Sequence, residues 1–399
     1  MKKVLIVIHD MEIGGAQKSL LSFCQVLATS DISKKYEINL MVVNPVGTFI
    51  TQIPDNIKMK QPPKELRWIG TPFSIELIRR YFSFRCLVGE ILWIVRNHLG
   101  LFPHNWNLQQ KLWRSWRRIV PMLDENYDIA ISYMDGVPNY YAMEKVHAQK
   151  KVLWFHSEYQ KQGYDPQYDL CYYGKSDAIV TISEKCRDCL LQEFSQHGEK
   201  IHVLENITSA QLLDQFSQMY FPEEYLEKKC FKILSVGRLH FQKGFDLAVH
   251  AAKELEASGV DFFWWIVGDG SEREGLQDLI EREGISHRIK LLGARENPYP
   301  YIRHCDLLVQ PSRLEGKSIV LDEAKILCKP IVVTNYTTVS ASIEHGVDGW
   351  IVEMNSHGIA HGIQELYENP AIRDSLSENL QKQAKGNEAE MLNYINIMF

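Results

Sequence analysis

Residues 231–267 have the sequence FKILSVGRLHFQKGFDLAVHAAKELEASGVDFFWWIV, which contains a complete strand–helix–strand unit. The apolar runs Phe231–Val236 and Phe262–Val267 flank Phe245–Leu255, where apolar residues have helical spacing. Short apolar runs bounded by glycine predict strands that are covered on both faces, as in a parallel sheet. The segment therefore predicts a right-handed βαβ crossover.

The same alternation continues on both sides of this unit. Helical spacing recurs at Gln17–Leu27, Glu272–Glu283 and Ser318–Leu327, and Lys329-Pro330 stops the last of these. Further strands are predicted at 4–8, 38–43, 129–132, 152–155, 178–182, 289–292, 307–309 and 331–333. Strands that alternate with helices indicate doubly wound α/β domains.

A chain of 399 residues suits two such domains, and the polar stretch Leu204–Lys229, interrupted by Pro222, indicates their boundary. We expect two Rossmann-like doubly wound parallel-sheet domains that face each other across a cleft, where ligands of such sheets bind. The domains are predicted at 1–207 and 208–384, with a C-terminal helix at 385–399 that packs back on the N-terminal domain.

Composition excludes several classes of protein. The chain is 45% hydrophobic and 24% charged, typical of a soluble enzyme, and its net charge of −6 gives no reason to expect a nucleic-acid partner. The apolar run Val4–Ile8 is too short for a signal peptide, and Cys86–Val95 is too short for a membrane span. Cys186 and Cys189 lack the second ligand pair of a zinc site. We expect a cytoplasmic protein with free thiols.

Two glutamates follow the strand at 307–309. Glu315 lies in the loop 311–318, and Glu323 lies about two turns into the next helix. Ser318 is the expected N-cap of that helix, and Lys317, Ser318 and Ile319 would present its amide donors to a phosphate. Carboxylates accept hydrogen bonds from vicinal hydroxyls, so the pair could hold a sugar and a ribose. By spacing alone, two ordinary glutamates on a solvated helix face are an alternative.

Arg238 and Lys243 lie in the glycine-flanked loop after the strand Phe231–Val236. Two cations at this position suit a diphosphate leaving group, whose developing charge they would neutralise as a metal does elsewhere. The chain contains no D-x-D carboxylate pair for a catalytic metal, and we expect no metal or other cofactor. Surface ion pairing is the alternative for both residues.

These motifs together resemble the family 4 glycosyltransferases of GT-B fold. The resemblance covers residues 4–352 and is strongest over 231–352. Its motifs are Gly14-Gly15-Ala16-Gln17, Ile182-Ser183-Glu184, Gly237-Arg238 to Lys243-Gly244, Val267-Gly268-Asp269-Gly270, and Glu315 with Glu323.

The resemblance implies a retaining transfer without a metal. It implies that Arg238 and Lys243 bind the donor diphosphate, that Gly14 and Gly15 let the backbone approach the same phosphates, and that Glu315 holds the transferred sugar and Glu323 the ribose. His156 matches the histidine that faces the sugar, and Arg295 lies where the nucleobase is held. The chain departs from the family pattern at Asn206, at Asn335–Val339 and at Cys328, which occupies a helix end where glycine is usual.

The segment from Lys64 to Arg118 is basic and aromatic. It contains ten basic residues against Glu65, Glu76 and Glu90, and five of the nine tryptophans. This composition indicates an interface with an anionic membrane. The alternatives are an RNA-binding patch, which the acidic chain disfavours, and core tryptophans with solvated arginines.

We therefore expect a retaining, peripheral-membrane glycosyltransferase that moves a sugar from a UDP-sugar to a lipid-linked glycan in cell-surface polysaccharide synthesis. A nucleotide-sugar epimerase of similar fold is the first alternative. A nicotinamide-dependent dehydrogenase is disfavoured because neither half has G-x-G-x-x-G after its first strand. A non-catalytic glycan-binding relative is disfavoured by the intact charged residues.

Overall fold

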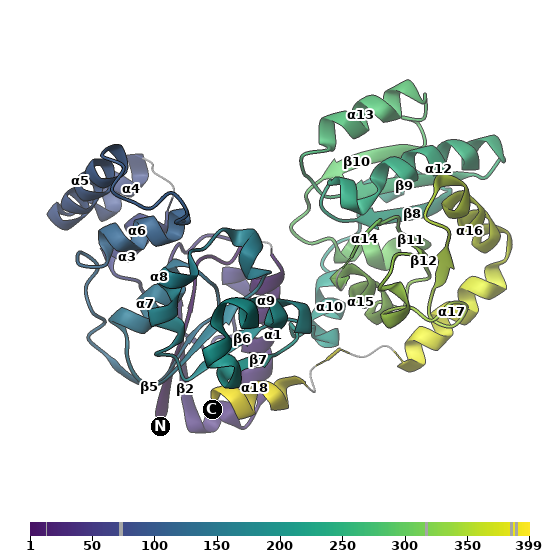
Figure 1. The fold of residues 1–399 in the computed structure, drawn as a ribbon. Coiled ribbons are helices and arrows are strands. Elements are labelled where there is room, and N and C mark those ends of the chain that lie inside the picture. Colours follow the sequence, from purple (N-terminus) through teal and green to yellow (C-terminus); the bar gives the residue numbers. More distant parts are fainter. Residues whose placement is uncertain (13, 72–74, 316–317, 384–385, 388–389) are drawn as a thin grey trace. The chain divides into compact units, whose positions relative to one another are not determined.

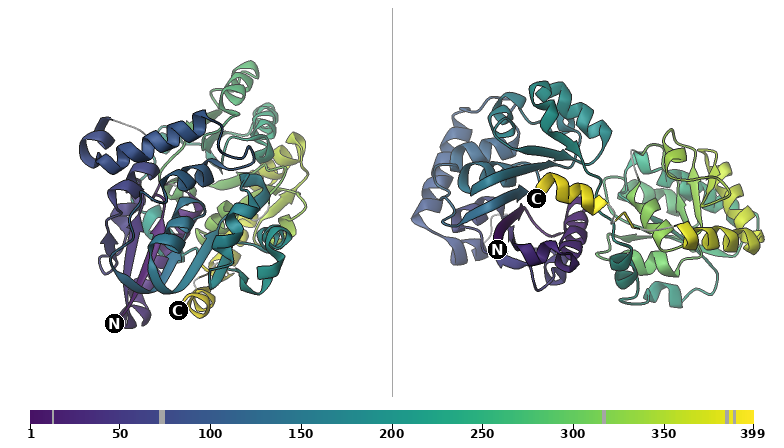
Figure 2. Two further views of the ribbon diagram at one scale, coloured as in Figure 1. Left: turned by 60° about the vertical axis from the view of Figure 1, so that its left-hand side comes forward. Right: turned by 90° about the horizontal axis from the view of Figure 1, so that it is seen from below.

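The computed structural model describes residues 1–12, 14–71, 75–315, 318–383, 386–387 and 390–399. The chain forms two compact units: unit 1 comprises Met1–Thr208 and Asn387–Phe399, and unit 2 comprises Ser209–Gly386 (Figure 1). Each unit contains one fully parallel sheet with helices on both faces, so the α/β fold class is as predicted (Figure 2).

Unit 2 is built on a six-stranded sheet in the order β10-β9-β8-β11-β12-β13. Its strands are β8 (Phe231–Val236), β9 (Phe262–Val267), β10 (Ile289–Gly293), β11 (Leu307–Gln310), β12 (Ile331–Thr334) and β13 (Trp350–Val352). Its helices are α10 (Ala210–Ser217), α11 (Glu223–Leu226), α12 (Phe245–Ala257), α13 (Arg273–Arg282), α14 (Tyr299–His304), α15 (Ile319–Ile326), α16 (Ser356–Glu368) and α17 (Pro370–Gln383), with the short η4 (Phe241–Lys243) and η5 (Val339–Ala341).

A buried polar chain crosses the centre of this sheet. The indole of Trp264 donates to Ser235 Oγ at 3.0 Å, and Ser235 donates to the carbonyl of Val309 at 2.6 Å. The chain links β9, β8 and β11, and it satisfies the indole N–H that burial of Trp264 would otherwise leave unpaired. The register of β8 against its neighbours is thereby fixed by side chains as well as by the backbone.

Unit 1 is built on a seven-stranded sheet in the order β3-β2-β1-β4-β5-β6-β7. Its strands are β1 (Lys2–Ile8), β2 (Tyr36–Val42), β3 (Lys58–Lys60), β4 (Asn126–Ser132), β5 (His147–Phe155), β6 (Ala178–Thr181) and β7 (Ile201–Val203). Its helices include α1 (Gly15–Thr29), α2 (Ile32–Lys35), α7 (Val137–Lys145), α8 (Pro166–Tyr173), α9 (Glu184–Phe194) and α18 (Met391–Met398), with the short η1 (Thr48–Gln52), η2 (Tyr159–Gln162) and η3 (Ser195–Lys200).

The C-terminal helix α18 is part of unit 1. The Tyr394 hydroxyl donates to the carbonyl of Glu205 at 2.8 Å, and its ring lies 5.2 Å from that of Phe23 on α1. Asn387 donates through Nδ2 to the carbonyl of Asn206 at 3.0 Å. The end of the chain therefore packs on residues more than a hundred positions earlier in the sequence.

Three strands of the structure, β3, β7 and β13, were not predicted. Each has three residues and lies at an edge of its sheet, where only one neighbour is present. Edge strands are short, and the sequence of β3 (Lys-Met-Lys) is polar. An apolar-run criterion therefore finds the central strands and misses these edges.

The segment 64–118 forms four helices, α3 (Lys64–Gly70), α4 (Ile75–Tyr81), α5 (Phe84–His98) and α6 (Leu108–Trp116). Trp68, Trp113 and Trp116 are buried in the core of unit 1, while Trp93 and Trp106 are half-buried. The core alternative is thus correct for three of the five tryptophans. Across the described ranges, no helix is both long and apolar enough to cross a membrane.

A buried carboxylate joins this segment to the rest of unit 1. Asp169 on α8 accepts hydrogen bonds from Gln110 Nε2 on α6 at 2.9 Å, from the Tyr140 hydroxyl at 2.7 Å and from the Tyr159 hydroxyl at 2.7 Å. Burial raises the pKa of Asp169 to about 6, and the three donors oppose that rise. Asp169 is the point at which α6, α7, α8 and η2 meet.

Candidate functional site

The loops that follow β8, β9 and β10 are in close backbone contact. Gly268 has φ 149° and its amide donates to the carbonyl of Gly293 at 3.0 Å. A Cβ at Gly268 would lie 1.8 Å from the Gly237 carbonyl oxygen, and one at Gly270 would lie 2.4 Å from the Leu239 carbonyl oxygen. The glycines of Val267-Gly268-Asp269-Gly270 are therefore required by the approach of one loop to the next.

The loop after β8 is also fixed to the loop after β11. Gly244 has φ 64°, and a Cβ there would lie 2.0 Å from the Pro311 carbonyl oxygen. Arg313 donates to both carboxylate oxygens of Asp246 at 2.7 and 2.6 Å, and its guanidinium lies 4.3 Å from the ring centre of Phe241. Burial opposes ionisation of Asp246, but the bonds and charge of Arg313 hold its pKa below the usual value. This bidentate pair fixes the two loops to each other.

Glu315 is the centre of the site. Its carboxylate binds Lys243 Nζ at 2.6 and 2.9 Å, and it accepts hydrogen bonds from Gln310 Nε2 and Ser312 Oγ, both at 2.6 Å. The side chain of Glu315 is only 9% exposed. Four short contacts from two loops place this carboxylate at the carboxyl ends of β8 and β11.

Glu323 is more deeply buried, at 2% exposure. The hydroxyl of Tyr299 donates to Glu323 Oε1 at 2.7 Å, and the ring of Tyr299 stacks with Phe216 at 6.1 Å. Burial, with the charge of Glu323, raises the pKa of Tyr299 well above its usual value, so the phenol remains a donor. The alternative of two glutamates on a solvated helix face is wrong for both residues.

Ser318 occupies the N-cap position of α15, but its side chain does not cap the helix. Its hydroxyl donates instead to Gln310 Oε1 at 2.9 Å. The predicted N-cap position is therefore confirmed, but the side chain makes no capping bond because the buried side-chain amide of Gln310 offers a competing acceptor. Ile319 begins the helix and is partly exposed, whereas Lys317 lies outside the described residues.

The two cations of the loop after β8 have different surroundings. Lys243 forms an ion pair with Glu315. Surface ion pairing was the alternative given for Lys243, but this pair lies within the site. Arg238 is exposed, and no ion pair joins it to another residue in the part of the chain that the structure describes. Arg295, after β10, donates to Glu224 at 2.8 Å and to the Tyr301 hydroxyl at 3.1 Å, so its guanidinium is bound to α11 and α14.

In unit 1, Gly14 is the N-cap of α1 and has extended backbone, and no side chain caps this helix. A Cβ at Gly14 would lie 2.3 Å from Gln17 Oε1, and Gln17 Nε2 donates to Asp10 Oδ1 at 2.9 Å. Gly15, the first residue of α1, is exposed. The helix start is thus accessible at the carboxyl end of β1.

His156 follows β5, and its ring lies 5.4 Å from that of Tyr133 and 6.0 Å from that of Trp154. Its Nε2 lies 2.9 Å from the carbonyl oxygen of Tyr133, and because a carbonyl only accepts, Nε2 carries the proton. Nδ1 then has a lone pair and is buried without a partner among the described residues. Burial lowers the pKa of His156 to about 4, so the ring is neutral near pH 7.

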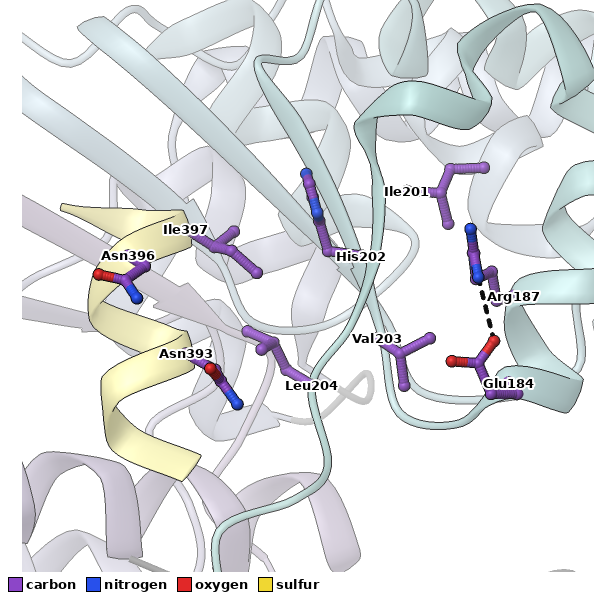
Figure 3. A pocket seen from close by; sticks show the side chains of 9 residues that line it. All are labelled: Glu184, Arg187, Ile201, His202, Val203, Leu204, Asn393, Asn396 and Ile397. Carbon is purple, nitrogen blue, oxygen red and sulfur yellow. Dashed lines mark hydrogen bonds and ion pairs between the residues drawn. The ribbon is translucent and has the colours of Figure 1, made fainter. Parts of the chain in front are cut away.

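The motif Ile182-Ser183-Glu184 has a local structural explanation. Ser183 caps α9 by accepting from the amide of Cys186 at 3.2 Å, and Glu184 pairs with Arg187 at 3.1 Å. Both charged residues line a polar groove between β7, α9 and α18 (Figure 3). The groove contains none of the predicted donor-site residues.

Sequence reasoning missed five residues that shape the site, namely Asp246, Tyr299, Gln310, Ser312 and Arg313. Gln310 and Ser312 could have been found, because they follow the predicted buried strand at 307–309 and precede Glu315 closely. Tyr299 and Asp246 gave no sequence signal, since only the tertiary fold brings them to Glu323 and Arg313.

Residues 218–385 match the family Glycosyl transferases group 1. Alpha-D-kanosaminyltransferase of Streptomyces kanamyceticus is 28% identical over 211 residues, which are 51% of this chain and 55% of that protein. The N-acetylgalactosamine-N,N'-diacetylbacillosaminyl-diphospho-undecaprenol 4-alpha-N-acetylgalactosaminyltransferase of Campylobacter jejuni is 29% identical over 216 residues, 53% of this chain and 57% of that protein. The chain spans about half the length of the curated relatives it matches.

Solved structures resemble the chain over almost its whole length. Anabaena HepE in complex with UDP-glucose has a TM-score of 0.61 at 17% identity and covers 96% of this chain and 94% of its own. S. aureus TarM has a TM-score of 0.62 at 14% identity, with 100% and 99% covered. These likenesses establish the GT-B fold. Over residues 218–385 the chain is similar to the glycosyl transferases group 1.

Proposed function

We propose that the protein is a retaining glycosyltransferase that uses a UDP-sugar. The observation that carries this proposal is the Lys243–Glu315 pair, in which a cation and a carboxylate from adjacent loops meet at 2.6 Å at the carboxyl ends of β8 and β11. Ligands of open α/β sheets bind at this end of the strands. A nucleotide-diphosphate sugar requires both charges, one for its phosphates and one for its hydroxyls.

In this proposal the donor diphosphate replaces Glu315 beside Lys243, and Arg238 binds the same phosphates. Arg238 is exposed at the end of β8, as an arginine that receives a diffusing anion would be. The first amides of α15 add to this phosphate site, and the hydroxyl of Ser318, which is bound to Gln310, does not occupy them. Ile319 is the remaining phosphate contact proposed in unit 2. For unit 1 by itself, we propose that the accessible start of α1 at Gly14 and Gly15 binds a phosphate.

Glu315, once separated from Lys243, accepts hydrogen bonds from the transferred sugar while Gln310 and Ser312 hold its carboxylate in position. Glu323 accepts the ribose hydroxyls, and Tyr299 fixes its orientation. We further propose that neutral His156 accepts a hydrogen bond from a sugar hydroxyl at Nδ1, the ring atom that has no partner among the described residues. The backbone near Arg295 is assigned to the nucleobase, with its side chain held by Glu224.

The proposed transfer needs no separate base. The acceptor oxygen forms its bond to the anomeric carbon on the face from which the diphosphate leaves, and the bond from that carbon to phosphate oxygen breaks. The acceptor proton passes to the departing diphosphate, which leaves as UDP. Lys243 and Arg238 stabilise the charge that develops on the leaving group, so this chemistry requires no metal ion.

We propose a lipid-linked glycan as acceptor and cell-surface polysaccharide synthesis as the process. The Campylobacter relative is named for an undecaprenol diphosphate substrate, and relatives from Rhizobium meliloti and Erwinia amylovora are named for lipopolysaccharide core and amylovoran biosynthesis. Such an acceptor is displayed at a membrane, so we also propose peripheral association of the enzyme with the inner face of the plasma membrane through residues 64–118.

The test is a screen of nucleotide sugars against the purified chain, with UDP release measured in the presence and absence of EDTA. We expect release from one UDP-sugar, insensitive to EDTA, and loss of release in Glu315→Ala. The matched control is Glu274→Ala, an exposed glutamate on α13. Full activity of Glu315→Ala would overturn the role assigned to Glu315. UDP release that requires no acceptor and yields an epimerised sugar would favour the epimerase. Turnover of NAD would favour a dehydrogenase.

A further inference from the structure

Helix α5 is exposed along one continuous apolar side. Phe84 is 77% exposed, Leu87 41%, Ile91 51% and Ile94 59%. These positions are separated by three or four residues, so at 3.6 residues per turn they fall within an arc of about 80° on one face of the helix. Single exposed apolar residues are common on soluble proteins, but an aligned stripe of large ones is not.

The opposite side of α5 is fixed against unit 1. Cys86 is buried, and a Cβ added at Gly89 would lie 2.5 Å from the ring of Trp116. Glu90 accepts a hydrogen bond from the indole of Trp68 at 2.7 Å, and Ser83 caps the helix through the amide of Cys86. The rotation of α5 about its axis is therefore set by close packing, and the exposed stripe is a fixed feature of the fold.

Large apolar residues on either side of α5 in the sequence are exposed as well. Ile75 and Ile78 on α4, Phe82 between the two helices, and Leu99 and Leu101 after α5 are also exposed. We call Ile75, Ile78, Phe82, Phe84, Leu87, Ile91 and Ile94 the α4–α5 face. In Figure 1 these two helices lie at the end of unit 1 away from its strands, with α3 and α6 beneath them.

Cations accompany the α4–α5 face. Residues 75–98 contain four arginines and two glutamates. Arg79, Arg80 and Arg85 are exposed, whereas one glutamate, Glu90, is bound by Trp68. On α4, helical geometry places Arg79 beside Ile75, whereas Arg85 and Arg96 lie about 100° or more from the nearest residue of the α5 stripe. Arg96 donates to the carbonyl of Arg114 on α6 at 2.9 Å. Basic residues beside an apolar stripe complement the anionic headgroups and the acyl boundary of a bilayer.

We propose that the α4–α5 face inserts into the interface of an anionic bilayer, with α5 parallel to the membrane plane. This inference rests on the proposed function and names the surface that carries out its membrane association. The inserted residues are phenylalanine and aliphatic side chains, and the buried Trp68, Trp113 and Trp116 support the helices from within. At about 22 Å, α5 is too short to cross a hydrocarbon core, which agrees with an interfacial position. A second copy of the chain is disfavoured as occupant because it would bring two basic surfaces together.

The test is flotation of the full chain with vesicles of phosphatidylcholine, with and without phosphatidylglycerol, at low and high salt. We expect binding to the anionic vesicles that salt weakens. Ile91→Glu should lower the partition coefficient by roughly tenfold or more, because it places a charge in the stripe. The matched control is Leu226→Glu, an exposed leucine of unit 2 at 68% exposure, which should bind as the wild type does. Circular dichroism verifies that both variants fold.

Three outcomes would overturn the inference: no flotation of the wild type, equal flotation of Ile91→Glu, and equal binding to neutral and anionic vesicles. A wild-type dimer that Ile91→Glu dissociates, without vesicle binding, would instead assign the face to a second copy and would also overturn it. UDP release is measured separately without vesicles. If the wild type floats with anionic vesicles but releases no UDP, the proposed function alone is overturned. If it releases UDP but does not float, this inference alone is overturned.

Discussion

Lys243 Nζ lies 2.6 Å from Glu315 Oε1 and 2.9 Å from Oε2, so one lysine spans both oxygens of a carboxylate that is almost buried. Residues 72 positions apart in sequence meet because β8 and β11 are neighbours in the sheet. The pair joins an almost buried carboxylate to a partly buried ammonium group, and each charge is also the group that the proposed donor would need. Disrupting the pair should therefore affect stability and ligand binding in separable ways.

Replacing Glu315 by glutamine should separate binding from turnover. The amide keeps an oxygen for Ser312 and Gln310 but no longer competes with a diphosphate for Lys243, so UDP affinity should be unchanged or tighter. Transfer should fall by roughly a hundredfold or more, because the charge that holds the sugar in the transition state is lost. Calorimetry with UDP and steady-state kinetics measure the two effects, with Glu274→Gln as control. An unchanged kcat would contradict the assigned role.

Replacing Lys243 by methionine should lower UDP affinity and also destabilise unit 2. The substitution leaves Glu315 ionised and largely buried with only neutral donors, a cost of about 1–3 kcal/mol in the free energy of unfolding. Adding Glu315→Gln removes that uncompensated charge, so the double variant should regain stability without regaining turnover. Urea unfolding of the three variants measures this coupling. If the double variant is no more stable than Lys243→Met, the loss of stability does not come from the unpaired charge of Glu315.

Asp169 should control the attachment of α6 to the rest of unit 1. Asp169→Ala removes the acceptor for Gln110, Tyr140 and Tyr159 and should lower the free energy of unfolding by about 3 kcal/mol. Asp169→Asn keeps an acceptor oxygen and should cost much less. Thermal and urea unfolding compare the two variants, and equal losses would contradict the role of the hydrogen bonds.

The contribution of Asp169 to the free energy of unfolding should depend on pH with a definite sign. Burial raises the pKa of Asp169 from 3.8 to about 6, so between these values the folded chain holds a proton that the unfolded chain has released. The stability of the wild type relative to Asp169→Asn should therefore increase as pH falls from about 6 to about 4, and it should level off below that range. A difference that grows with rising pH would contradict this.

Cys328 is strained at the end of α15. It has φ 55°, and it is the one non-glycine residue with positive φ in the described part of the chain. The amides of Cys328 and Lys329 donate to the carbonyls of Lys325 and Ala324, the pattern in which glycine is usual. Cys328→Gly should raise the free energy of unfolding by about 1 kcal/mol, whereas Cys328→Ala keeps the strain and should not. Equal stability of the two variants would contradict the strain.

The sequence determined the fold class and the positions of the central strands along the chain. Apolar runs bounded by glycine located β8 and β9 at the observed residues, because strands covered on both faces have a continuous apolar sequence. It also led to the prediction of a site with Glu315, Glu323 and Lys243, since side chains that follow neighbouring parallel strands collect at one edge of the sheet. The unusual helix end at Cys328 was also visible in the sequence, because a cysteine stands where glycine is usual and the backbone has positive φ.

Only the tertiary structure decided which groups pair. The Ser318 hydroxyl binds Gln310 instead of capping its helix, Tyr299 fixes Glu323 and Lys243 binds Glu315, because long-range packing determines which acceptors lie within reach. Tertiary packing also decided the orientation of residues 64–118: it buried three of the tryptophans and left Phe84, Leu87, Ile91 and Ile94 exposed. Composition gives the apolar content of a helix, but only its contacts determine which apolar side faces the core and which faces outward.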